Sequence, residues 1–122
     1  LATGSMVEIA IKSIEVINSK FSFNPTVVNC RFIKPLDTKM LDEIISSHEI
    51  LITMEEGILT GGFGSSIVNY TKNMNITIET MGIKDEYVEH GTRKELLDLV
   101  GLNTDSLINL IEKNLNLNSG DN

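Results

Sequence analysis

The sequence predicts an α/β fold in which helices cover both faces of a mostly parallel sheet, giving a three-layer sandwich. Short apolar runs that suit buried strands alternate with segments whose apolar residues recur at helical spacing. One such run, Ile50 to Thr53, leads into a glycine-rich turn and a helix-like segment, which together make half of a βαβ unit. Because the 122 residues contain no internal repeat or long linker, we expect one domain over residues 1–116 and a flexible tail over 117–122.

The first part of the chain is expected to form two helices separated by a strand. Ser5 is a plausible N-cap for the first helix, and Asp37 for the second. The strand, Thr26 to Cys30, follows a turn at Asn24-Pro25. The apolar positions of the two helices are Val7, Ala10, Ile11, Ile14 and Ile17, then Met40, Leu41, Ile44 and Ile45.

The second part continues the alternation and ends in two helices. Gly101 separates those two helices as a C-terminal stop. Residues 82–91 are polar and irregular. The elements expected here are the strand Ile50 to Thr53, the helix Ser65 to Asn73, the strand Ile76 to Met81, and the helices Arg93 to Val100 and Asp105 to Leu115.

Composition excludes several classes of function. Ten basic residues against 17 acidic ones give a net charge of −7, so neither nucleic acid nor an anionic membrane is an expected partner. No apolar run approaches the ~20 residues of a membrane span, and no targeting peptide is recognised at the start. The single cysteine, Cys30, lies in an apolar run and is expected to be a small buried residue rather than a nucleophile.

The turn after Ile50 to Thr53 holds the residues best placed for function. Glu55 and Glu56 stand where the carboxyl edge of the sheet should be, which is where open α/β folds bind ligands. Neighbours on an extended chain point to opposite sides, so the pair favours backbone capping or an interface contact over acid–base catalysis. Gly61, Gly62 and Gly64 could cradle a phosphate, but they match neither a dinucleotide fingerprint nor a P-loop, and tight packing explains them better.

The two histidines form no metal motif, because they are far apart and have no cysteine partner. His48 follows the second helix and suits the negative end of that helix. His90 lies in the polar loop and is the better functional candidate. Residue chemistry alone therefore predicts an α/β domain with no self-sufficient active site.

Three segments together resemble the C-terminal domain of the 1-deoxy-D-xylulose-5-phosphate synthases, which are thiamine-diphosphate transferases of the transketolase superfamily. The segments are Val28 to Asp37, then Glu55-Glu-Gly57 with Gly61-Gly-Phe-Gly-Ser65, and Met81 to Leu97. Arg31-x-x-x-Pro35-Leu-Asp37 and Glu55-Glu-Gly57 are also similar to 2-oxoacid dehydrogenase β subunits, and Ala2-Thr-Gly-Ser5 to transketolase. The glycine run and Glu89-His-Gly91 point to the synthase.

The resemblance implies a parent enzyme that condenses pyruvate with D-glyceraldehyde 3-phosphate, releases CO2 and supplies non-mevalonate isoprenoid synthesis and, in some organisms, thiamine synthesis. Thiamine diphosphate and Mg2+ are implied for the parent, held by motifs in other domains, and no cofactor is expected in this fragment. The partners implied are the other domains of its own chain and a second protomer in a homodimer. The compartment implied is the bacterial cytoplasm or a plastid-type organelle.

The resemblance also assigns a packing surface. Six residues are expected at the contact with the catalytic domains or the second protomer: Glu55, Glu56, Gly61, Gly62, Gly64 and His90. The fragment is expected to be catalytically silent alone, and the rival interpretation from another class is a free-standing module that binds a phosphorylated ligand in the glycine loop. Gly4-Ser5-Met6 could be a cloning scar, but the resemblance favours native sequence and a first strand that is truncated.

Overall fold

The computed structural model describes residues 1–31, 34–58, 61–83 and 91–115, and all structural statements below concern these ranges. It contains helices α1 (Met6–Lys20), α2 (Thr38–Ser47), α3 (Phe63–Thr71), α4 (Arg93–Leu99) and α5 (Thr104–Leu115), and strands β1 (Ile50–Ile58) and β2 (Thr77–Ile83). None of the described helices is long and apolar enough to cross a membrane.

The sheet is parallel, as expected. β1 and β2 pair in parallel from Ile50 opposite Thr77 to Met54 opposite Met81. On the other side of β1, Ala2 makes parallel bridges to both Met54 and Asn29. Residues 1–3 therefore lie in the sheet between β1 and the segment around Asn29. The strand predicted over Thr26 to Cys30 is shorter than expected, since only Asn29 makes a bridge.

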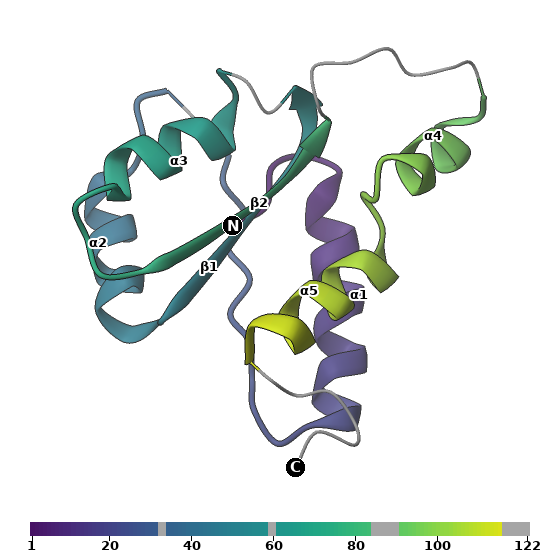
Figure 1. Ribbon diagram of the computed structural model, residues 1–122, viewed down its shortest axis with the longest axis horizontal. Coiled ribbons are helices and arrows are strands. Elements are labelled where there is room, and N and C mark those ends of the chain that lie inside the picture. Colours follow the sequence, from purple (N-terminus) through teal and green to yellow (C-terminus); the bar gives the residue numbers. More distant parts are fainter. Residues whose placement is uncertain (32–33, 59–60, 84–90, 116–122) are drawn as a thin grey trace.

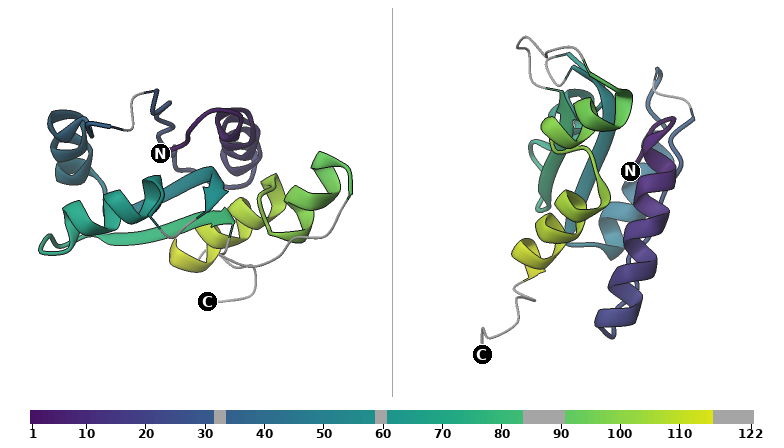
Figure 2. Two further views of the ribbon diagram at one scale, coloured as in Figure 1. Left: turned by 90° about the horizontal axis from the view of Figure 1, so that it is seen from above. Right: turned by 90° about the vertical axis from the view of Figure 1, so that its right-hand side faces the viewer.

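Helices cover both faces of the strands, so the α/β three-layer prediction is confirmed. α2 and α3 lie on one side of the strands, and α1, α4 and α5 lie on the other (Figures 1 and 2). Side chains alternate between two cores. The α1 side buries Ala2, Met6, Ala10, Met54, Met81, Leu97, Leu102 and Leu107, and the α3 side buries Cys30, Leu41, Phe63 and Ile67.

Local signals account for where most helices begin and end. The Asp37 carboxylate accepts a hydrogen bond from the Met40 N–H at 3.0 Å, as its predicted capping role requires. Gly101 has a φ of +78°, the left-handed conformation that ends a helix. Ser5 does precede α1, but its hydroxyl makes no capping bond to the helix, so that part of the prediction was wrong.

Candidate functional site

Glu55 and Glu56 lie at the carboxyl end of β1, where their side chains point to opposite faces of the sheet. The register between β1 and β2 shifts there: Met54 pairs with Met81, but Ile58 pairs with Ile83, so β1 has extra residues in between. Such a bulge changes the direction of side chains near the end of a strand. Glu55 and Glu56 therefore do not share a site, as the alternation of side chains along an extended chain predicts.

Glu55 is buried beneath α3 and holds the start of that helix. Only 5% of the residue is exposed. Its carboxylate accepts hydrogen bonds from the backbone N–H groups of Phe63 at 3.0 Å and Gly64 at 2.6 Å. These are first-turn donors that the helix itself cannot satisfy, and the helix dipole favours a negative charge there. Glu55 thus supplies the anion that this helix N-terminus would otherwise attract.

The glycines of the turn have structural reasons to be glycine. Gly61 has a φ of +73°, which other residues rarely adopt. A Cβ on Gly64 would lie 2.8 Å from Thr53 Oγ1, 3.0 Å from Glu55 Oε2 and 3.1 Å from Thr80 Cγ2. Absence of a side chain at Gly64 lets α3 approach the two strands and the Glu55 carboxylate closely. The tight-packing interpretation is therefore the one the geometry supports.

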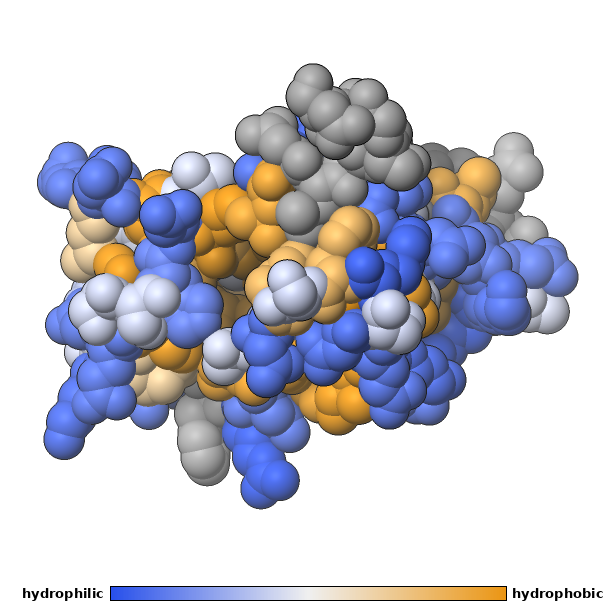
Figure 3. Space-filling view, turned by 90° about the horizontal axis from the view of Figure 1, so that it is seen from below, coloured by the Kyte–Doolittle hydropathy of each residue, from blue (hydrophilic) through white to orange (hydrophobic). Residues whose placement is uncertain are grey.

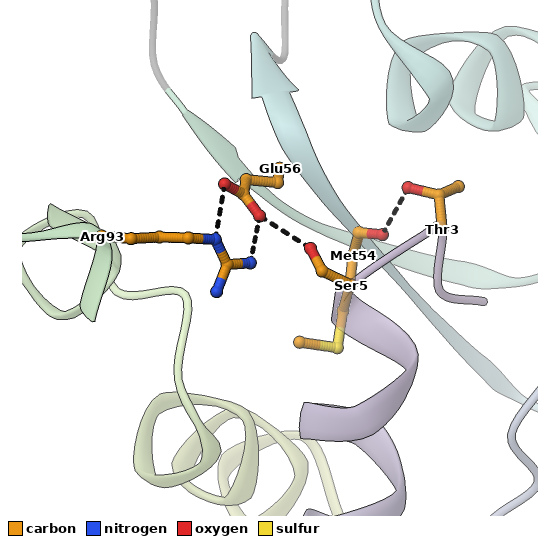
Figure 4. Close-up of polar contacts among 5 residues, drawn as sticks. All are labelled: Thr3, Ser5, Met54, Glu56 and Arg93. Carbon is orange, nitrogen blue, oxygen red and sulfur yellow. Dashed lines mark hydrogen bonds and ion pairs between the residues drawn. The ribbon is translucent and has the colours of Figure 1, made fainter.

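Glu56 connects three elements on the opposite face. Its carboxylate accepts hydrogen bonds from the Ser5 hydroxyl at 2.7 Å and from Nε and Nη2 of Arg93, the latter also an ion pair (Figure 4). Ser5 precedes α1, Glu56 belongs to β1, and Arg93 begins α4. We call Ser5, Glu56 and Arg93 the Glu56 cluster. The Glu56 side chain is 34% exposed, so the cluster meets solvent at the edge of the sheet.

Sequence reasoning did not identify the partners of Glu56. The sequence predicts Ser5 as a helix cap and Arg93 as the first residue of a helix near the end of the chain. They lie 51 and 37 residues from Glu56 in the chain. A single sequence carries no local signal for contacts at such separations. The available hint was a pair of opposite charges: Glu56 lies at the end of a predicted strand, and Arg93 lies at the start of a predicted helix.

The hydrogen bonds from Arg93, assisted by that from Ser5, hold the pKa of Glu56 below its ordinary value. A carboxyl whose pKa is lower in the folded state stabilises the fold above its unfolded pKa, and this contribution is lost as the pH falls through the folded value. Arg93→Gln should therefore raise the pKa of Glu56, measured by a carboxyl-carbon NMR titration. At pH 7 the free energy of unfolding should be lower for Arg93→Gln than for wild type. This difference should vanish when the pH falls below the pKa of Glu56.

Lys94→Gln is the matched control for this prediction. Lys94 is the next residue of α4, and its ammonium pairs with Asp98 instead. The pKa of Glu56 should stay unchanged in Lys94→Gln. An equal pKa of Glu56 in wild type and Arg93→Gln would show that the cluster does not persist in solution.

The remaining candidates have structural roles or lie outside the described residues. His48 Nδ1 lies 2.9 Å from the Ile44 carbonyl at the end of α2, and Nε2 lies 3.0 Å from the Thr26 hydroxyl, which confirms its place at the helix end. Cys30 is buried, and burial raises the pKa of its thiol, which disfavours a nucleophilic thiolate. His90 lies outside the described residues.

The arrangement leaves neither acidic residue free for proton transfer. Glu55 is engaged by two buried N–H groups, and Glu56 by a hydroxyl and a guanidinium. Within the described ranges, no three His, Cys, Asp or Glu residues come together in a way that could hold a metal ion. The carboxyl edge of the sheet is therefore built to join α1, α3 and α4 to the strands.

Comparisons with known proteins agree on one family. A family model described as "Transketolase, C-terminal domain" matches residues 1–107. Proteins described as 1-deoxy-D-xylulose-5-phosphate synthase are 42% identical over 95 residues in Pseudoalteromonas translucida and 35% identical over 115 residues in Clostridium tetani. These alignments cover 76% and 93% of this chain.

The relatives are much longer than this chain. It spans 15% of the length of the Pseudoalteromonas protein and 18% of the Clostridium protein. A solved structure described as a split gene transketolase in an inactive beta4 tetramer superposes with a TM-score of 0.84 at 25% identity. That superposition covers 95% of this chain and 38% of the other. The fold and the family are thus shared, and the similarity accounts for one part of each longer protein.

Proposed function

This chain belongs to the family of transketolase C-terminal domains, and on that premise we propose that it is the C-terminal domain of a 1-deoxy-D-xylulose-5-phosphate synthase. The observation that carries the proposal is the 35% identity to the Clostridium tetani synthase over 93% of this chain. The whole enzyme would condense pyruvate with D-glyceraldehyde 3-phosphate, with loss of CO2, to give 1-deoxy-D-xylulose 5-phosphate for isoprenoid and thiamine synthesis. The compartment we propose is the bacterial cytoplasm or a plastid-type organelle.

In that enzyme this domain would support assembly and would be catalytically silent alone. Thiamine diphosphate and Mg2+ would supply the carbanion chemistry of the whole enzyme. The residues described here do not fit that cofactor. The helix N-terminus that could attract a diphosphate already receives the Glu55 carboxylate. The same observation argues against a free-standing phosphate-binding module.

We propose that the carboxyl edge of the sheet contacts the catalytic domains or a second protomer. Glu56 and Gly61 are exposed there and can make such contacts, and His90 is proposed to join them. Glu55 and Gly64 are buried within the domain, so their contribution would be to shape this edge from inside. Gly62, half-buried before α3, would complete the turn.

Glu56→Ala in the complete synthase should weaken assembly more than chemistry. Loss of the Glu56 carboxylate frees Arg93 and Ser5 and removes a charge from the proposed contact. We expect the dimer dissociation constant to rise by about tenfold, which corresponds to 1.4 kcal/mol. The kcat of the assembled dimer should stay within about threefold of wild type. His90→Ala should behave similarly, as measured by sedimentation and steady-state kinetics.

Lys94→Gln is again the control, because the Lys94 side chain is 86% exposed and its ion pair is with Asp98 of the same helix. It should leave both assembly and kcat unchanged. An intact dimer with a collapsed kcat in Glu56→Ala would contradict the assembly role and would place Glu56 in the reaction.

The split gene transketolase match supports a second candidate, a transketolase parent, because it covers nearly all of this chain with a TM-score of 0.84. The proposed domain role would be the same in that parent, but the substrates would differ. Identifying the product that the complete enzyme forms would distinguish a 1-deoxy-D-xylulose-5-phosphate synthase from a transketolase.

A further inference from the structure

β2 is the outer strand of the sheet, and one of its two edges is open. Its inner edge pairs with β1, and residues 1–3 lie beyond β1 on the far side (Figure 2). In the part of the chain that the structure describes, no strand pairs with the outer edge of β2. Gly82 has no side chain and is still partly exposed, so part of the surface that this strand shows to solvent is main chain.

The hydrogen bonds between the two strands show which groups of β2 face outward. The Thr77 N–H donates to the Glu49 carbonyl at 3.0 Å. In a parallel ladder, alternate residues turn both their N–H and C=O groups to the same side, so Glu79 and Met81 also face β1. The main-chain groups that face outward are those of Ile78, Thr80 and Gly82.

β2 lacks the features that commonly prevent an edge strand from pairing. Proteins protect such edges with proline, with lysine or with a bulge in the edge strand itself. Residues 77–83 contain neither proline nor lysine, and the extra residues between the paired strands belong to β1. Three of the seven residues, Thr77, Ile78 and Thr80, are β-branched, which favours an extended strand. The outer edge is therefore regular and suited to accept another strand.

The edge is complementary to a second copy of itself. When two copies of β2 run antiparallel about a two-fold axis at Thr80, Thr80 meets the partner's Thr80 and Ile78 meets the partner's Gly82. Each pair of outward residues exchanges two main-chain hydrogen bonds, about six in all. Threonine pairs across strands are favourable. The one charged residue of the strand, Glu79, lies opposite the partner's Met81 rather than opposite another acid.

We propose that the outer edge of β2 is a self-association surface, through which two copies of this chain join their sheets into one. The symmetric register pairs the outward groups of both copies at once, as a two-fold contact requires. This surface is separate from the carboxyl edge proposed above to meet the catalytic domains. It is also separate from an apolar hollow of about 320 Å3 between α1, α5 and residues 49–52, because none of the residues that line the hollow belongs to β2 (Figure 3).

The test is sedimentation of the 122-residue chain over a range of concentrations. A contact along one strand is smaller than the roughly 1,200–2,000 Å2 of a specific stable interface, so we expect a weak dimer with a Kd below about 1 mM. Amide hydrogen exchange at Ile78, Thr80 and Gly82 should slow as the dimer forms. The amides of Glu79 and Met81, which face β1, should be protected at every concentration and so report that the domain is folded.

Thr80→Lys places two like charges directly opposite each other at the two-fold axis, and it should weaken the dimer by about tenfold or more. Thr77→Lys is the matched control, because Thr77 is exposed and its N–H faces β1. It should leave the Kd within about threefold of wild type. Gly82→Pro removes an outward N–H that the ladder with β1 does not use, and it should also weaken the dimer.

The apolar hollow is the competing surface for self-association, and Leu115→Gln tests it. Leu115 is 38% exposed and lines the hollow, so this substitution should leave the β2 dimer unchanged. A chain that stays monomeric at about 1 mM would overturn the proposal. So would a dimer that does not slow exchange at Ile78, Thr80 and Gly82, or one that Leu115→Gln dissociates and Thr80→Lys does not. None of these results depends on the reaction of the larger enzyme, so they are separable from a failure of the proposed function.

Discussion

Glu55→Ala is expected to lower the free energy of unfolding by about 2–4 kcal/mol, the largest loss we expect from a single substitution at the carboxyl edge of the sheet. The Glu55 carboxylate accepts hydrogen bonds from the N–H groups of Phe63 and Gly64. Alanine removes this acceptor, so both buried N–H groups lose their hydrogen-bond partner. Denaturant unfolding at pH 7 measures the loss. Glu56→Ala, the adjacent and more exposed acid, should cost less than half as much.

The vacated end of α3 should then become an anion site. We expect inorganic phosphate to recover part of the stability lost in Glu55→Ala, because first-turn N–H groups and the helix dipole attract anions. Glu55→Gln keeps one acceptor oxygen and fills the space, so it should lose less stability and show little recovery. Salts also stabilise proteins generally, so the comparison is between the two variants. Equal stability of Glu55→Ala and wild type would contradict the capping role.

Gly64→Ala is expected to cost about 2–3 kcal/mol and to lower the Tm by about 10 °C. The added methyl group would come within 2.8–3.1 Å of Thr53, Glu55 and Thr80, which belong to the two paired strands. Since Thr53 is fully buried, it has little room to move. α3 must shift away from the sheet, which also lengthens the hydrogen bonds that Glu55 accepts.

Gly57→Ala is the matched control for Gly64→Ala. Gly57 lies near the end of β1, and a Cβ there would meet its nearest atom, Glu55 Oε1, at 3.7 Å, an ordinary contact. We expect a loss below about 1 kcal/mol. Similar unfolding midpoints for the two variants would show that the close approach of α3 does not depend on glycine at position 64.

Features with a local physical cause could be predicted from the sequence. The Asp37 cap and the Gly101 stop each depend on residues within one or two turns, whereas the apolar face predicted for α1 is only partly right: Ala10 and Ile17 are buried, but Ile11 is 49% exposed. β1 extends to Ile58, well beyond the predicted end at Thr53, because two acids and a glycine resemble a loop when read alone. In the structure they form the irregular end of a strand, where α3 and the Glu56 cluster accommodate their charges.

The sequence predicts the structural role of Glu55 and Glu56, but it does not predict which groups they contact. Opposite orientations for Glu55 and Glu56 follow from the alternation of an extended chain, and capping was already the favoured role. The identity of the capped helix depends on how the turn folds back, and the Arg93 contact depends on the whole topology. The contact between this domain and the rest of an enzyme stays a prediction.

The most direct test of the central claim is to replace the matching segment of the Clostridium tetani synthase with this chain and to assay the product formed from pyruvate and D-glyceraldehyde 3-phosphate. We predict that the chimera forms 1-deoxy-D-xylulose 5-phosphate and releases CO2, whereas the 122-residue chain alone forms none. A folded and assembled chimera without this product, or turnover by the isolated chain, would contradict the proposal that this is a silent domain of such a synthase.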